Sequence, residues 1–102
     1  MTDNYKKQKN FSKEWVFTRG WIPYFEMFNS WDYKPKHRLL LSLIYEFELH
    51  DKKFDLTTKE ISNLMRMSEI TIKRYVSLLV KQGVITSEKI GKTRTLKLIN
   101  KQ

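Results

Sequence analysis

The chain has 102 residues, a formal net charge of +9 and no cysteine. Its length suits one domain around one core, and a hydrophobic share of 40% argues against wholesale disorder. The absence of cysteine excludes disulfides and thiolate metal sites, and it is compatible with a reducing cytosol.

The amino terminus, MTDNYKKQKN, lacks the apolar stretch of a signal peptide. The run LLLSLIY is far shorter than the ~20 apolar residues that cross a bilayer. We therefore expect a cytoplasmic protein without a membrane span.

The cationic excess lies mainly in the second half of the chain. Residues 1–50 hold eight Lys or Arg and six Asp or Glu, whereas residues 51–102 hold twelve and five. An excess of this kind suits a polyanionic partner, with nucleic acid as the first candidate and an anionic membrane surface as the second.

Residues 1–10 are polar and rich in lysine, so we expect a flexible basic arm ahead of a single domain over residues 11–102. Nine aromatic rings follow within residues 11–33, where Gly20 and Pro23 interrupt any long helix. Short helical turns or extended chain should wrap the core there. Most of these rings are predicted to be core, but a few could form a homodimer interface, because nine rings are more than a small core readily absorbs.

The first clear helix is predicted to begin near Pro35, a residue that suits a first helical turn. Its buried face should hold the apolar residues at 3.6-residue spacing: Leu39, Leu40, Leu43, Ile44 and Phe47. A short connector follows, in which residues 54–56 could form one small strand.

Two further helices are predicted on either side of a tight turn. Thr57 stands three residues before Glu60, the spacing of a capping box, and Ser68 is expected to cap the second helix. That helix should run to about Gln82, with Gly83 just beyond its end. The first of the two helices should bury Ile61, Leu64 and Met65.

The helix over residues 69–81 has two different faces. The apolar face carries Ile72, Tyr75, Val76 and Leu79, at spacings that belong in a core. The opposite side is polar and cationic, with Thr71, Lys73, Arg74, Ser77 and Lys81. A helix that enters the major groove of DNA needs this combination, because Arg and Lys donate to guanine while Ser and Thr suit phosphates or base edges.

The stretches VITSEKI and RTLKLIN alternate in character around a glycine-containing turn, which predicts a β-hairpin. The tip of this hairpin carries Lys89, Lys92 and Arg94 and could reach the neighbouring minor groove or backbone. The fold class is therefore predicted as α+β and mostly helical, and the favoured partner is double-stranded DNA.

The stretch LTTKEISNLMRMSEITIKRYVSLLVKQGVI, followed by a hairpin, resembles the winged helix-turn-helix of bacterial regulators such as the MarR and GntR groups. The positions that match the pattern are Glu60, Ser68, Thr71, Ile72, Arg74, Leu79 and Gly83. The upstream stretch beginning GWIPYFEMF is similar to winged-helix domains in replication initiators and replisome organisers of Gram-positive plasmids and phages. The resemblance implies a three-helix core with a C-terminal β-hairpin wing, in a small transcriptional or replication-control regulator of a mobile element.

The chain departs from these families in two ways. It lacks the long C-terminal helix through which MarR-type proteins dimerise and the ligand domain of GntR-type proteins, and it lacks the second domain of a full replication initiator. We therefore expect a stand-alone DNA-binding module.

The candidate DNA contacts fall into three groups. The recognition helix offers Ser68, Glu69, Thr71, Lys73, Arg74 and Ser77; the wing offers Lys89, Lys92, Thr93 and Arg94; Lys59 is a candidate for a backbone phosphate. Each group has a simpler alternative. Cations on a helix are commonly just solvated, cations at a hairpin tip can protect a sheet edge, and Glu69 could stabilise the helix dipole.

Enzymatic and metal-binding functions have little support. His37 and His50 stand 13 residues apart without cysteine, and the glycines are isolated, so we expect no metal, no cofactor and no enzymatic activity. The alternative function is a winged-helix interaction module that docks a replication or transcription protein through its aromatic amino-terminal third.

Overall fold

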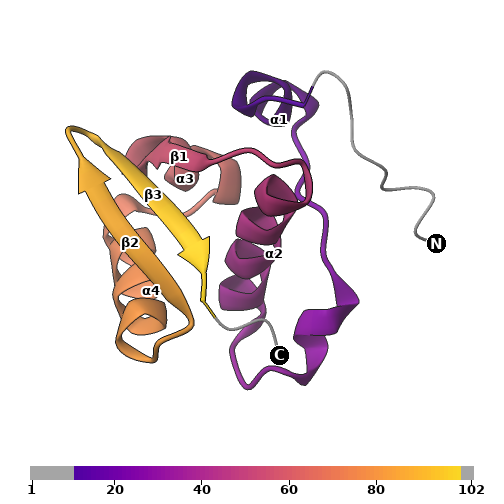
Figure 1. Ribbon diagram of the computed structural model, residues 1–102, viewed down its shortest axis with the longest axis vertical. Helices are drawn as coiled ribbons and strands as arrows, with labels where there is room; N and C mark the ends of the chain where they lie inside the picture. Colours follow the sequence, from indigo (N-terminus) through magenta and orange to yellow (C-terminus); the bar gives the residue numbers. More distant parts are fainter. Residues whose placement is uncertain (1–10, 100–102) are drawn as a thin grey trace.

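The computed structural model describes residues 11–99, so the predicted arm over residues 1–10 lies outside the described part of the chain. Within it, four α-helices, one 3-10 helix and three strands follow one another along the chain (Figure 1). Their bounds are α1 Lys13–Arg19, η2 Glu26–Ser30, α2 Pro35–Leu49, β1 Phe54–Thr57, α3 Thr58–Met65, α4 Glu69–Lys81, β2 Ile85–Ile90 and β3 Thr93–Leu98. The predicted α+β class, with helix as the larger share, is confirmed.

Helix α2 occupies the centre of the fold (Figure 1). Its predicted face is buried at Leu40, Leu43, Ile44 and Phe47, while Leu39 is half-buried. Leu41, Ser42 and Glu46 are buried as well, so the helix is enclosed on more sides than the 3.6-residue pattern indicated. A helix that is buried nearly all round must be covered by several elements. The sheet packs on one part of α2, and the segment from α1 to η2 covers another.

The aromatic segment before α2 supplies much of this cover. Phe11, Phe28 and Trp31 are buried, and Trp15, Phe17, Phe25 and Tyr33 are partly buried against the core. The backbone N–H of Phe25 donates to the hydroxyl of Ser42 on α2 at 3.1 Å. The prediction that most of the nine rings are core is therefore confirmed. Trp21 and Tyr24 are the exceptions, at 51% and 40% exposed.

A buried ion pair joins α1 to α2. The two terminal nitrogens of Arg19 donate to the two carboxylate oxygens of Glu46 at 2.6 and 2.5 Å, and the side chains are 4% and 0% exposed. The guanidinium carbon also lies 4.8 Å from the ring centre of Trp15 and 4.0 Å from that of Trp21. A bidentate geometry with ring stacking holds a planar guanidinium in one orientation.

The three strands form one antiparallel sheet in the order β1-β3-β2. The predicted hairpin is present as β2 and β3, which are joined by Gly91 and Lys92, and Gly91 takes the left-handed conformation with a φ of 62°. The small strand predicted at residues 54–56 is also present, as β1, and it pairs Phe54 with Leu96. On the central strand β3, Leu96 and Leu98 are buried on one face, whereas Lys97 between them is exposed on the other.

Loss of Arg19 with Glu46 retained should be strongly destabilising. We expect Arg19→Met to lower the free energy of unfolding by about 3–5 kcal/mol, because the buried carboxylate loses its bidentate cation. The measurement is urea denaturation followed by circular dichroism. The double variant Arg19→Met/Glu46→Leu should recover most of the loss, since both charges of this pair are then removed; a double variant as unstable as the single one would contradict this account.

Candidate nucleic-acid interface

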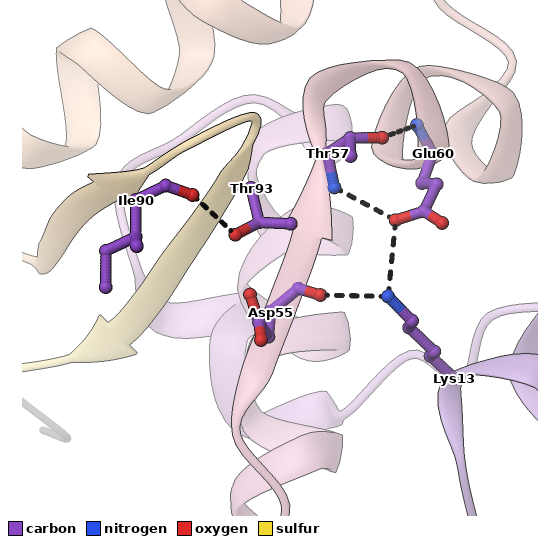
Figure 2. Close-up of polar contacts among 6 residues, drawn as sticks. All are labelled: Lys13, Asp55, Thr57, Glu60, Ile90 and Thr93. Carbon is purple, nitrogen blue, oxygen red and sulfur yellow. Dashed lines mark hydrogen bonds and ion pairs between the residues drawn. The ribbon is translucent and has the colours of Figure 1, made fainter.

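The start of α3 is tied to two neighbouring elements. Thr57 and Glu60 form the predicted capping box: the N–H of Glu60 donates to the Thr57 hydroxyl at 3.0 Å, and the N–H of Thr57 donates to the Glu60 carboxylate at 2.9 Å (Figure 2). Lys13 of α1 lies 3.8 Å from that carboxylate and donates to the carbonyl of Asp55 in β1 at 3.4 Å. Lys59, in the same first turn of α3, is exposed.

A tight turn of three residues separates α3 from α4. Arg66 ends α3 in the left-handed conformation with a φ of 57°, which is uncommon for a residue with a side chain. The hydroxyl of Ser62 donates to the carbonyl of Met67, whose own N–H donates to the carbonyl of Ser62 at 3.1 Å. These bonds fix the direction in which α4 leaves the turn.

The inner face of α4 packs as the sequence predicts. Ile72, Val76 and Leu79 are buried, and Tyr75 is partly buried. The ring of Tyr75 lies 3.9 Å from the imidazole of His37, which belongs to the first turn of α2. Tyr75 is thus a packing residue, and its contact with His37 sets α4 against the central helix.

The outward face of α4 is cationic and open. Glu69, Lys73, Arg74 and Ser77 are all exposed. Among the described residues, neither Lys73 nor Arg74 forms an ion pair with an acidic side chain. A further residue stands among them that the sequence analysis did not select: Ile70, which is 63% exposed. The 3.6-residue period places Ile70 on the same side as Lys73, Arg74 and Ser77.

Ser68 and Thr71 have local roles at the start of α4. The Ser68 hydroxyl accepts a hydrogen bond from the N–H of Thr71 at 3.1 Å, which confirms it as the helix cap. The two hydroxyl oxygens lie 2.8 Å apart. Both groups already have a partner, so they are weaker candidates for an external ligand than the open side chains of Lys73 and Arg74.

The hairpin tip lies level with the start of α4. Helix α4 has 13 residues and is about 20 Å long at 1.5 Å per residue. Strand β2 has 6 residues and covers about the same 20 Å at 3.3 Å per residue. Because β2 runs back alongside α4, the tip and the amino-terminal end of α4 face the same end of the molecule (Figure 1).

The four predicted wing residues are not equivalent. Lys89 and Lys92 are exposed, whereas Thr93 and Arg94 are partly buried. The Thr93 hydroxyl donates to the carbonyl of Ile90 at 3.0 Å across the turn (Figure 2). Arg94 donates from Nε to the Thr58 hydroxyl of α3 at 3.1 Å.

The inward position of Arg94 could have been found in the sequence. The register pairs Lys89 with Arg94, Ser87 with Leu96 and Ile85 with Leu98 on one face of the hairpin. Because alternate residues of a strand share a face, Arg94 must lie on the side of the two buried leucines. Its guanidinium therefore joins the hairpin to α3, whereas Lys89 and Lys92 remain exposed cations near the tip.

The described residues hold no group of three or more His, Cys, Asp or Glu side chains that could bind a metal ion. Over residues 11–99, every helix is too short or too polar to cross a bilayer.

Comparison of the chain with protein-family models, with curated proteins and with solved structures gives no match.

His37 should make stability depend on pH. Burial and the nearby Lys34 ammonium lower the pKa of His37 below its ordinary value. The Nδ1 atom of His37 is buried without a hydrogen-bond partner among the described residues, so a proton there would find no acceptor. The unfolded chain therefore binds the proton more readily than the folded chain.

We expect the free energy of unfolding to be highest above about pH 6.5, the ordinary pKa of histidine, and to fall as the pH is lowered below it. The measurement is the urea midpoint between pH 7.5 and 5.5, above the range in which most carboxylates titrate. His37→Phe keeps a ring against Tyr75 and should reduce the dependence of the urea midpoint on pH. Any contribution from His50 is the same in the parent and the variant, because both proteins retain it. An equal decline in the variant would assign the effect to another group.

Proposed function

We propose that this chain is a winged helix-turn-helix protein that binds double-stranded DNA sequence-specifically. Helix α4 enters the major groove, and the turn between β2 and β3 contacts the flanking backbone. In this proposal the protein works in the cytoplasm as a small regulator of transcription or replication for a mobile element, a plasmid or a phage.

The order of elements supports the proposal. A central helix, a short strand, two helices around a tight turn and a hairpin follow one another as α2, β1, α3, α4, β2 and β3. In a winged helix-turn-helix the second helix of the pair is the one that enters the groove, and the hairpin is the wing. The tip of the hairpin and the start of α4 face the same end of the molecule, so one duplex can meet both.

The observation that carries the proposal is the division of α4 into two faces. One face is held in the core by Ile72, Val76 and Leu79. The other presents Lys73 and Arg74 without acidic partners among the described residues. Unpaired cations on a helix that is narrow enough for the major groove can donate to guanine O6 and N7 or to phosphates.

The exposed lysines around this helix add the sequence-independent part of binding. Lys59 at the start of α3 and Lys92 at the hairpin tip are both exposed. Contacts between such ammonium groups and phosphates release counterions, so affinity for any duplex should fall steeply as salt is raised.

Two copies on an inverted repeat complete the proposal. Trp21 and Tyr24 remain exposed on the segment before α2 and are the aromatic residues we assign to the homodimer contact. The same rings also support a second candidate function, in which this segment docks a replication or transcription protein. Absence of any binding to duplex DNA at low salt, together with binding of a protein partner that Trp21→Ser abolishes, would favour the second candidate.

The first test concerns sequence preference. We expect Arg74→Ala to weaken binding to a site selected from a random duplex pool by about 1–3 kcal/mol, and to relax the preference at one base position. Electrophoretic mobility shifts with the selected duplex and a scrambled duplex measure both effects. The symmetry of the selected site also reports whether two copies bind. If Arg74→Ala kept the full preference of the parent, α4 would not be the reading helix.

The second test concerns the backbone. We expect Lys92→Ala to weaken binding to every sequence alike and to reduce the slope of log affinity against log salt by about one. Lys53→Ala is the matched control, because it removes the same charge from an exposed position in the connection between α2 and β1. The control should keep the slope of the parent. Equal effects of the two substitutions would show that only net charge matters and would remove the hairpin tip from the interface.

A further inference from the structure

Ile70 stands out on the proposed DNA-reading face. At 63% exposed it is the most exposed of the large hydrophobic side chains recorded for the described residues. It is the second residue of α4, directly after Glu69 and two residues after the Ser68 cap. The core does not use it, because Ile72 fills the buried position at this end of the helix.

The neighbours of Ile70 are the groups expected to read bases. Lys73 and Arg74 follow it by three and four residues and Ser77 by seven, and all three are exposed. Residues at these spacings lie on one face of a helix, with Cβ atoms about 5–6 Å apart between adjacent turns. The face therefore combines two cations and a hydroxyl with one branched apolar group.

The position along the helix is also informative. In a helix-turn-helix it is the amino-terminal part of the reading helix that contacts base edges, while later residues approach the backbone. Ile70 lies in that first turn. A β-branched residue at this position is neither the best helix former nor able to hydrogen-bond to a phosphate. Contact with an apolar group of the DNA is therefore the best explanation for an isoleucine here.

The major groove offers one prominent apolar target, the C5 methyl group of thymine. We infer that Ile70 is a specificity-determining residue that contacts the C5 methyl of a thymine in the bound site. This inference rests on the proposed function, and it adds a base that the cations cannot select. Lys and Arg read guanine, whereas a branched aliphatic group distinguishes thymine from cytosine and from uracil.

The geometry also places that thymine. Ile70 and Arg74 are one helical turn apart, which separates their Cβ atoms by about 6 Å. Successive base pairs are about 3.4 Å apart along the duplex axis. The thymine read by Ile70 should therefore lie within about two base pairs of the guanine read by Arg74.

The test replaces thymine by uracil, which removes the methyl group and keeps base pairing. Each thymine of a site selected from a random duplex pool is replaced in turn. We expect the parent protein to lose about fourfold in affinity at one position, the effect of about 0.8 kcal/mol for one buried methyl group. Ile70→Ala should bind the thymine and uracil duplexes equally, and Ile70→Val, which keeps a branched side chain, should retain most of the discrimination.

Ile99→Ala is the matched control. Ile99 is also exposed, at 55%, but it follows the end of β3 that lies away from the hairpin tip. This variant should discriminate between thymine and uracil as the parent does. Circular dichroism checks that each variant is folded, which we expect because an exposed side chain is removed in both.

The outcomes separate the inference from the proposed function. If the parent binds its selected site with dependence on Arg74 but ignores every uracil substitution, only the assignment of Ile70 is overturned. The same holds if Ile70→Ala still distinguishes thymine from uracil. If the parent binds no duplex DNA at any salt concentration, both the proposed function and this inference are overturned.

Discussion

The buried ion pair between Arg19 and Glu46 is the constraint on which the rest of the arrangement depends. Helix α2 is enclosed nearly all round, so the carboxylate of Glu46 needs a cation from inside the protein. That cation is Arg19, the last residue of α1. The aromatic segment that contains α1 must therefore fold back over α2, so that Arg19 reaches Glu46. Because the amino-terminal segment covers this side of α2, the sheet and α4 pack on the remaining surface of α2. The contact between His37 of α2 and Tyr75 of α4 is one example.

The elements that surround α4 are held by polar contacts as well as by the core. Lys13 links α1 to the start of α3, and Arg94 links β3 to the same end of α3. These contacts engage cations that could otherwise have been assigned to a ligand. Lys73 and Arg74 on α4 and Lys89 and Lys92 near the hairpin tip are among the cations that stay exposed. A division of this kind, in which some cations hold the frame and others stay unpaired, is what the proposed DNA-binding function requires.

Local sequence signals predicted the elements well, because each depends on neighbours along the chain. The capping box of Thr57 and Glu60, the cap at Ser68 and the glycine after α4 are set by groups within a few residues of one another. The candidate site was harder to predict. The charge of Arg94 favours a DNA contact, yet strand alternation turns this residue toward Thr58. Ile70 is an apolar residue on an amphipathic helix, yet the core leaves it exposed.

The sequence by itself determined the α+β class, the bounds of the paired helices, the hairpin and the two faces of α4, since periodicity and capping are local properties. Only the tertiary structure decided how these elements combine. The pairing of β1 with β3 joins residues some 40 positions apart, and the contact of Arg19 with Glu46 spans 27. Which cations are engaged and which stay open follows from such distant contacts. They depend on the packing of whole elements, and no spacing along the chain encodes them.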